Sequence, residues 1–319
     1  MSAPPKAIGV DLGGTKLLTG VVDSERRVLH ESRERSAGAS ERGVIEAIER
    51  EVNEAREACP DVVGIGLGVP CTIDRERGVA INAVNLDITD VPIRDIIGER
   101  TGLPTFLDND ANCAMLAEHR FGAAKDAENA VLLTIGTGIG GGLIIGRELY
   151  RGTTGAAAEL GHVVVDENGP PCQGTCPNRG CVETMASGTA LARDGAAAAG
   201  RHPDSALGQA LAHGGIEGKT VTAAAMAGDE VAREVVATAG RHLGVALSSL
   251  ANIFDPDVIV IGGGVAVVGE LMLAPAREEL VERALPPMNR TPVKQAKLGG
   301  DAGMIGAAAM ALEEVGARA

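Results

Sequence analysis

The sequence predicts an α/β protein built from two similar halves, on the strength of three observations. Three apolar runs end in glycine clusters, at residues 6–16, 130–142 and 255–266, which is typical of buried strands that run into tight turns. The first two runs are each followed by a second apolar run, LLTGVVD and LIIGRELY, so the same hairpin is predicted twice. Helical patterns lie between these strands. We therefore expect an internal duplication, with a ligand bound between the two halves.

The spacing of apolar residues identifies the helices. In ERGVIEAIEREVNEARE, the apolar residues from Val44 to Val52 recur on one face of a helix. A second helix is predicted for ANCAMLAEHRFG after Asp110, the region from about 183 to 252 is mostly helical, and MIGAAAMALEEVGA forms a last helix. At 319 residues the chain exceeds the usual size of a single core, so two domains are expected.

Charge and composition exclude several classes of partner. The formal net charge of −14 opposes binding to nucleic acid and to anionic membranes. The N-terminal segment has no charged region followed by an apolar stretch, and no apolar run reaches the ~18 residues of a membrane span. We therefore expect a cytoplasmic protein. Because disulfides are rare in that compartment, clustered cysteines are expected to bind metal or to do redox work.

The glycine-rich turns are candidates for phosphate binding. GTGIGGG contains the pattern G-x-G-x-x-G at Gly136, Gly138 and Gly141, but that dinucleotide fingerprint needs a helix after the turn, and strand-like residues follow here. The P-loop pattern G-x-x-x-x-G-K-[ST] does not occur in the sequence. Phosphate binding by hairpin turns remains, although a strand followed by two glycines is more often only a hairpin.

The turn DLGGTK offers a complete set of phosphate ligands. Backbone N–H groups of Gly13 and Gly14 could approach phosphate oxygens, Thr15 offers a hydroxyl, Lys16 offers charge, and Asp11 could hold Mg²⁺ through water. Two further glycine turns favour nucleotide binding over a plain hairpin. The nucleotide-binding candidates in those turns are Thr137, Gly138, Gly262, Gly263 and Gly264.

Three cysteines form a candidate metal site. Cys172, Cys176 and Cys181 fall within ten residues, and His162 stands ten residues before the first of them. Three thiolates and one imidazole make a closed set of four ligands, which suits structural zinc and leaves no open position for a catalytic water. The alternative is a loop of free thiols. The other three cysteines are scattered singly upstream.

The motif DND, residues 108–110, lies where a predicted strand ends and a helix begins. Taken by itself, Asp110 is most simply interpreted as the N-cap of that helix.

Together these motifs resemble the ROK family of sugar kinases, within the actin-like (ribonuclease H-like) ATPase superfamily. The resemblance covers nearly the whole chain and rests on VDLGGTK, DNDANCAMLAEHRFG, TIGTGIGGGLIIGRELYRGTTGAAAELGHVVVD, the cysteine cluster and DPDVIVIGGGVA. It implies an α/β fold of two actin-like domains with an interdomain cleft. The small domain would comprise residues 1–108 plus 300–319, and the large domain residues 109–299 with the zinc-binding loop.

The resemblance also implies roles for single residues. Asp110 would be the general base of phosphoryl transfer from ATP, and Asn109 would bind sugar hydroxyls beside it. Glu159, His162 and Glu183 would reach sugar hydroxyls as well. One ring nitrogen of His162 would bind zinc and the other a sugar hydroxyl, so the metal would fix the orientation of the ring.

The sequence departs from the family pattern at a few positions. Three residues separate Cys172 from Cys176, where the family usually has one. We still expect Cys172 to bind zinc, because three intervening residues form an acceptable loop. Cys71 and Ile88 stand where the family often has Gly and Trp, in the region that shapes the sugar pocket. These departures leave the exact sugar open.

The implied activity is that of an ATP-dependent hexose kinase, with glucose as the leading substrate and its C6 hydroxyl as the acceptor. N-acetylmannosamine, N-acetylglucosamine and fructose are the alternatives within the family. The alternative of another class is a sugar-sensing transcriptional regulator that lacks its DNA-binding domain. About six residues before the first strand and the acidic charge disfavour it. As in many members of the family, a homodimer or homotetramer is expected.

Overall fold

The computed structural model describes residues 4–14, 16–35, 40–83, 86–174 and 176–318. The chain divides into two compact units. The first unit comprises Met1–Asp126, Glu148–Ala158 and Gly300–Ala319, and the second comprises Ala127–Arg147 and Glu159–Gly299. Within the described residues, no helix is both long enough and apolar enough to cross a membrane.

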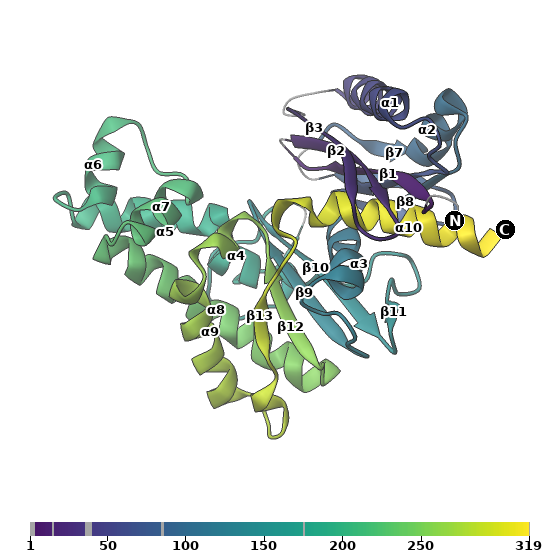
Figure 1. Ribbon diagram of the computed structural model, residues 1–319. Helices are drawn as coiled ribbons and strands as arrows, with labels where there is room; N and C mark the ends of the chain where they lie inside the picture. The colour runs from purple at the N-terminus through teal and green to yellow at the C-terminus, as the bar shows by residue number, and fades with distance from the viewer. Residues whose placement is uncertain (1–3, 15, 36–39, 84–85, 175, 319) are drawn as a thin grey trace. The chain divides into compact units, whose positions relative to one another are not determined.

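A five-stranded sheet forms the centre of the first unit (Figure 1). Its order is β3-β2-β1-β4-β8, with β1 and β2 antiparallel and with β1, β4 and β8 parallel. The predicted hairpin after the first apolar run is therefore confirmed. The strands are β1 (Lys6–Leu12), β2 (Lys16–Asp23), β3 (Val28–Arg35), β4 (Ile65–Val69) and β8 (Thr105–Asn109).

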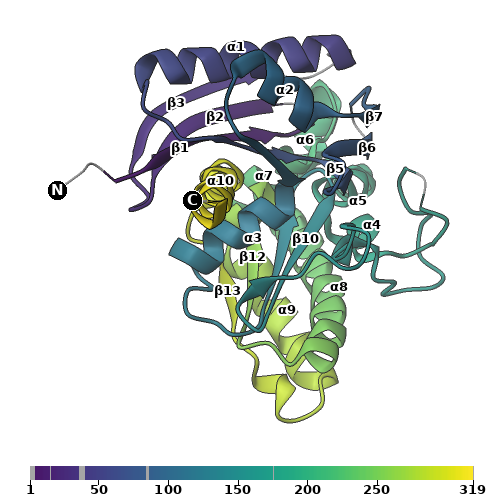
Figure 2. The same cartoon turned by 90° about the vertical axis from the view of Figure 1, so that its right-hand side faces the viewer.

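The two faces of this sheet differ in the side chains that they present. One face carries the aliphatic core, where residues such as Ile8 and Leu67 pack with α1 (Glu41–Ala58) and α2 (Ile93–Thr101). On the other face, glycines let α10 (Ala302–Arg318) approach the backbone, because a Cβ at Gly66 would lie 1.8 Å from the carbonyl oxygen of Ala307. Figure 2 shows α1 and α10 on opposite sides of the sheet.

Helix α3 (Asp110–Phe121) follows β8 directly and packs against α10. The sequence prediction that DND lies at a strand–helix junction is confirmed. A separate antiparallel sheet, which the sequence did not predict, has the order β5-β6-β7. Its strands are β5 (Cys71–Asp74), β6 (Val79–Ala83) and β7 (Thr89–Val91).

The second unit repeats the arrangement of the first. Strands β9 (Ala130–Ile135) and β10 (Ile139–Ile145) form an antiparallel hairpin, and β9 pairs in parallel with β12 (Val258–Gly262). A further strand, β13 (Val293–Gln295), pairs in parallel with β12. The predicted duplication of the hairpin is thus confirmed. Since a strand and not a helix follows the turn at residues 136–138, the dinucleotide fingerprint is also excluded.

Helices fill the rest of the second unit, as the sequence predicts for the region from 183 to 252. Helix α8 is the longest and packs against α4, α5, α7 and α9 (Figure 1). The helices are α4 (Val182–Ala186), α5 (Gly188–Arg201), α6 (Ala206–His213), α7 (Gly218–Met226), α8 (Glu230–Phe254) and α9 (Glu270–Arg283). The short 3₁₀ helices are η1 (Leu160–His162), η2 (Gly264–Val268), η3 (Met288–Arg290) and η4 (Gly299–Asp301).

The chain passes between the units at four points, and the residue before each point has a positive φ. These residues are Asp126 (φ 70°), Arg147 (φ 69°), Ala158 (φ 68°) and Gly299 (φ 58°). The segment after Arg147 begins with β11 (Glu148–Leu149) and packs with the first unit. Domain boundaries at 108/109 and 299/300 stay a prediction.

Candidate active site and metal centre

Acidic side chains gather at the carboxyl ends of the parallel strands in the first unit. Asp11 of β1 is in register with Gly68 of β4, which is in register with Asp108 of β8. Neighbouring strands lie about 4.8 Å apart, so the ends of β1 and β8 are close to each other. Asn109 and Asp110 follow at the start of α3. The fold therefore brings Asp11 and the DND motif to one edge of the sheet.

The N-cap of α3 is Asn109 and not Asp110. The Asn109 Oδ1 atom accepts hydrogen bonds from the backbone N–H groups of Ala111 (2.9 Å) and Asn112 (3.3 Å). Asp110 occupies the first helical position, where its Oδ1 atom accepts from the N–H of Ala111 at 2.9 Å. Helix capping therefore explains the asparagine at position 109, and it does not explain the aspartate at position 110.

Asp108 is the buried member of the motif, with 2% of its surface exposed. Its Oδ1 atom accepts from the backbone N–H of Asn109 at 2.8 Å and from Nδ2 of Asn112 at 2.9 Å. Its Oδ2 atom accepts from Nε of Arg151 at 2.6 Å. The sequence analysis did not single out Asp108 or Arg151, which lie 43 residues apart. Asp108 holds the turn that presents Asn109 and Asp110.

Asp11 lies in a poorly hydrated environment. A Cβ at Gly303 of α10 would lie 2.5 Å from the Asp11 carboxyl carbon, so glycine at this position leaves room for the Asp11 side chain where it now lies. Burial, followed by the charge of Asp110, raises the pKa of Asp11 from 3.8 to about 7. A nearby cation would favour the ionised form, which is consistent with the predicted contact to Mg²⁺.

The other predicted nucleotide ligands of the first unit lie in the β1–β2 turn. The backbone N–H of Gly13 donates to the carbonyl oxygen of Lys16 at 2.7 Å and closes the hairpin. Gly14 follows in the turn, and Lys16 is exposed at the start of β2. Thr15 lies outside the described residues. Phosphate binding by this turn stays a prediction.

The glycine turn of the second unit is occupied by a carboxylate. The Oε2 atom of Glu183 accepts from the backbone N–H of Ile139 at 2.8 Å, and a Cβ at Gly138 would lie 2.4 Å from the same oxygen. The structure therefore brings together Glu183, predicted to bind sugar, and Gly138, predicted to bind nucleotide. A side chain at position 138 would displace this carboxylate from its present place.

Helix α5 begins against the same turn, through residues that the sequence analysis missed. The backbone N–H of Gly188 donates to the carbonyl oxygen of Gly136 at 2.8 Å, and the hydroxyl of Thr189 donates to the carbonyl oxygen of Thr137 at 2.8 Å. The signal for Gly188 was its place after Ser187, whose hydroxyl caps α5. That signal predicts where α5 begins in the sequence, but not that its first residues contact the turn at residues 136–138.

The third glycine run, residues 262–264, packs on the end of strand β9. A Cβ at Gly263 would lie 2.4 Å from the carbonyl oxygen of Ile135, and Gly263 has a φ of 87°. Both facts require glycine at this position for structural reasons. Gly262 ends β12 and Gly264 begins η2, so the run forms the turn after that strand. Its predicted contact with nucleotide stays a prediction.

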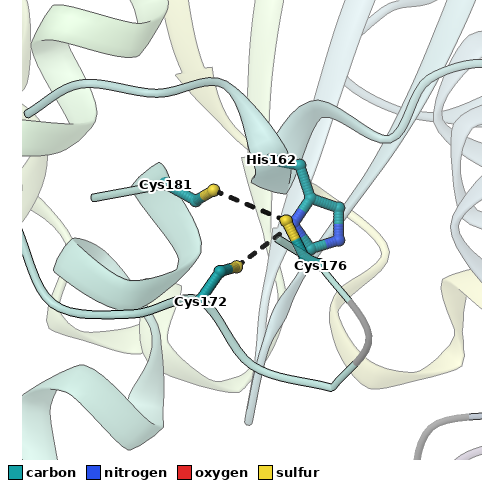
Figure 3. Close-up of side chains that lie close together, drawn as sticks. All are labelled: His162, Cys172, Cys176 and Cys181. Atoms are coloured by element: carbon teal, nitrogen blue, oxygen red, sulfur yellow. Dashed lines mark hydrogen bonds between the residues drawn. The ribbon is translucent and has the colours of Figure 1, made fainter. Parts of the chain in front are cut away.

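The predicted Cys₃His cluster is assembled in the second unit (Figure 3). The Cys172 Sγ atom lies 3.4 Å from Nδ1 of His162, and the Sγ atoms of Cys176 and Cys181 lie 4.0 Å apart. All four ligand atoms lie within 4.8 Å of one another. Tetrahedral zinc with Zn–S bonds of about 2.3 Å separates its sulfur ligands by about 3.8 Å. The donor set and its dimensions therefore fit zinc, and Cys172 belongs to the cluster despite its altered spacing. Its role as a zinc ligand stays a prediction.

Backbone pairing closes the loop around this cluster. Val164 pairs with Cys181, and Pro171 pairs with Arg179, as antiparallel bridges. Gly180 has a φ of 59°, and a Cβ there would lie 1.6 Å from the carbonyl oxygen of Asp166. Burial, with contributions from the neighbouring thiols, raises the pKa of Cys172 to about 12. A cation is therefore needed to keep this thiol ionised near neutral pH.

The ring of His162 has two different neighbours. Its Nδ1 atom faces the cysteines, whereas its Nε2 atom lies 3.9 Å from a carboxylate oxygen of Glu159. Glu159 precedes η1, and its side chain is 60% exposed. This arrangement suits the predicted division of labour, in which one nitrogen binds metal and the other is directed to a ligand.

Comparisons with known proteins agree with this architecture. The model of the ROK family matches residues 7–314. A glucokinase of Streptomyces coelicolor is 39% identical over 313 residues, which cover 96% of this chain and 97% of that protein. A putative xylose repressor of Caldicellulosiruptor sp. is 30% identical over 97% of this chain and 78% of that protein.

Similarity to a solved structure confirms the predicted α/β, actin-like fold. The crystal structure of a ROK family glucokinase from Streptomyces griseus, in complex with glucose and AMPPNP, matches with a TM-score of 0.87. Its sequence is 39% identical, and the match covers 97% of this chain and 99% of that chain. The chain therefore belongs to the ROK family.

Proposed function

We propose that the protein is an ATP-dependent hexose kinase that transfers the γ-phosphoryl group of ATP to the C6 hydroxyl of glucose. One structural observation supports this proposal above all others. Asn109 caps α3, so Asp110 is not needed as the cap and stands beside Asp11 at the edge of the sheet. The similarity to two Streptomyces glucokinases, each 39% identical, supports glucose as the acceptor.

Asp110 acts as the general base. Phosphoryl transfer needs little covalent chemistry from the protein, because catalysis comes mainly from positioning and from stabilising charge. The carboxylate of Asp110 accepts the proton of the sugar hydroxyl as that oxygen attacks the γ-phosphorus atom. The bond from the γ-phosphorus atom to the bridging oxygen breaks, and ADP leaves with the electron pair.

Nucleotide binding is assigned to the glycine turns. Backbone N–H groups of Gly13 and Gly14 are proposed to bind phosphate oxygens, with Lys16 adding positive charge. Mg²⁺, when bound, neutralises the phosphate charge, and Asp11 is proposed to hold it through water. The turn residues of the second unit proposed to bind nucleotide are Thr137, Gly138, Gly262, Gly263 and Gly264.

Sugar binding is assigned to five polar side chains. The side chains proposed to bind sugar are Asn109, Asp110, Glu159, His162 and Glu183. Bound zinc would hold the cysteine loop closed and fix the ring of His162, so that its Nε2 atom stays available to a hydroxyl group. The metal has a structural role in this proposal, because four protein ligands leave no position for substrate.

Two alternatives are distinguishable from this proposal. N-acetylmannosamine, N-acetylglucosamine or fructose could replace glucose, because Cys71 and Ile88 differ from the residues that the family often has in the region expected to shape the sugar pocket. The second alternative is a sugar-sensing regulator, and the observation in its support is the 30% identity to a putative xylose repressor. A regulator would bind sugar without turnover. Assembly as a homodimer or homotetramer stays a prediction.

The test is direct. The purified protein is incubated with Mg·ATP and glucose, mannose, fructose, N-acetylglucosamine or N-acetylmannosamine, and sugar phosphate is detected by mass. The Asp110→Asn variant serves as the matched control for background phosphorylation. Turnover of glucose above the other sugars supports the proposal. Turnover of another sugar corrects the substrate, and a sugar that raises the melting temperature without any turnover supports a regulator instead.

A further inference from the structure

The ion pair between Arg151 and Asp108 differs from the other ion pairs of α3 and its surroundings. The Asp108 side chain is 3% exposed and that of Arg151 is 23% exposed, with 2.6 Å between Nε and Oδ2. Arg120 of α3 makes a pair of the same length with Glu313, but both of those side chains are 44% exposed. Solvent screens the second pair, whereas the first is largely shielded from water.

Arg151 stands among several negative charges. Asp11, Asp108 and Asp110 all lie near the buried thiol of Cys113, whose pKa they raise together with burial. Arg151 acts on the same thiol in the opposite direction. The guanidinium therefore lies within electrostatic reach of the region where Asp110 is proposed to accept a proton.

Removal of this guanidinium would leave Asp108 as a buried carboxylate without its cation. A buried charge that has lost its partner is strongly disfavoured, so the side chain would move toward water or exchange its hydrogen-bond partners. Either response would disturb the Oδ1 atom, which holds the backbone N–H of Asn109 and the side chain of Asn112. The effect would thus pass directly to the turn that carries Asp110.

The segment that carries Arg151 is itself fixed within the first unit. The carbonyl oxygen of Arg151 accepts from the N–H of Ala157 at 3.1 Å. A Cβ at Gly155 would lie 2.7 Å from the carbonyl oxygen of Ile73, so this segment also packs closely on β5. The guanidinium is therefore presented to Asp108 from a well-defined loop.

We propose that Arg151 is a positioning residue for phosphoryl transfer, which pairs with the buried carboxylate of Asp108 and thereby holds Asp110 in place as the base. The inference rests on the proposed kinase function. It assigns to Arg151 an indirect role through Asp108, without contact to sugar or nucleotide.

The experiment compares the steady-state kinetics of Arg151→Met, Asp108→Asn and the double variant with those of the wild-type protein, using glucose and Mg·ATP. We expect Arg151→Met to lower kcat on the order of 10- to 100-fold near pH 7, with a smaller change in the KM for glucose. In the double variant at least about tenfold of the lost activity should return, because no buried charge is left without its partner.

Arg120→Met is the matched control, because it removes an arginine from an exposed pair of equal length and should leave kcat unchanged. An unchanged kcat in Arg151→Met would overturn the inference, as would a double variant no better than the single one. If Arg151→Met does not fold, a folded and active double variant supports the charge-pairing role, and an unfolded one refutes it. Absence of turnover by the wild-type protein would instead reject the kinase proposal.

Discussion

The sheets of the two units have the same strand order at their centres but different chemistry at the carboxyl ends of their strands. In both, an antiparallel hairpin pairs in parallel with a third strand, as β2-β1-β4 and as β10-β9-β12. The first sheet ends in Asp11 and the DND motif. The second ends in a glycine turn whose one adjoining carboxylate among the described contacts, Glu183, comes from α4.

The comparison separates what topology provides from what side chains provide. Parallel strands bring their carboxyl ends to one edge of a sheet, so we expect a ligand to bind at that edge in each unit. In the first unit that place contains ionisable groups in a poorly hydrated setting, which suits proton transfer. In the second unit it offers mainly backbone groups, which suits binding. The following predictions test this division, from the largest expected effect to the smallest.

Asp110→Asn, in the first unit, should abolish most of the kinase activity of the protein. A general base typically contributes about 10²- to 10⁴-fold, so kcat should fall by at least that range while the affinity for glucose falls far less. Steady-state kinetics and glucose binding by calorimetry measure the two effects. The melting temperature should stay near that of the wild type, because Asn109 supplies the cap. A kcat within a few-fold of the wild type would remove Asp110 from catalysis.

Cys181→Ser should open the metal loop of the second unit. Cys181 is fully buried in the cluster, so its loss should remove bound zinc and raise the KM for glucose through disorder of His162. A ligand whose free concentration is 1,000 times its Kd adds about 4 kcal/mol to the free energy of unfolding. Loss of zinc should therefore lower the free energy of unfolding by an amount of this order. Metal analysis and thermal unfolding measure both changes.

Cys59→Ser is the matched control, because Cys59 lies in the first unit at the end of α1. It should retain the zinc content of the wild type. Wild-type protein that holds no zinc after dialysis would contradict the metal assignment outright.

Asp11 should make the stability of the first unit depend on pH. Its folded-state pKa of about 7 exceeds the usual 3.8, so the folded protein binds the extra proton between these values. The free energy of unfolding should therefore fall as pH rises from about 4 to 7, and Asp11→Asn should remove that fall. The variant should be more stable than the wild type at pH 8 by roughly 2–4 kcal/mol and no more stable at pH 4.

Denaturant unfolding at several pH values measures this difference, and the Mg·ATP affinity of Asp11→Asn should fall. Asp61→Asn serves for comparison, because a hydrogen bond from Lys6 lowers the pKa of that exposed carboxyl. Its effect on stability should be small and of opposite sign. Equal pH dependence in the wild type and in Asp11→Asn would contradict the assignment.

Ala158→Gly should give the smallest effect, at the point where the chain leaves the first unit. Ala158 has a φ of 68°, which costs a residue with a side chain about 1–2 kcal/mol and costs glycine little. The variant should therefore be more stable by about 1 kcal/mol in thermal or denaturant unfolding. Ala156→Gly, at a residue without positive φ, should be neutral or destabilising. Equal effects of the two changes would argue against strain at Ala158.

Local patterns in the sequence determined much of this protein. The repeated hairpin, the helix after DND and the cysteine cluster each depend on residues close together in the chain. Their signals are hydrophobic periodicity, turn chemistry and ligand spacing, all of which act over a few residues. That is why these elements, and through their combination the family, could be predicted from the sequence.

The tertiary structure decided which long-range partners meet. Arg151 pairs with Asp108, which lies 43 residues away in the sequence. Glu183 accepts a hydrogen bond from the β9–β10 turn beside Gly138, and the start of α5 donates one to the same turn. It also decided that Asn109 and not Asp110 caps α3, because the cap depends on the backbone angles at the junction. The pKa of Asp11 follows from burial and from Asp110. Such contacts depend on how strands and helices pack, which no local pattern encodes.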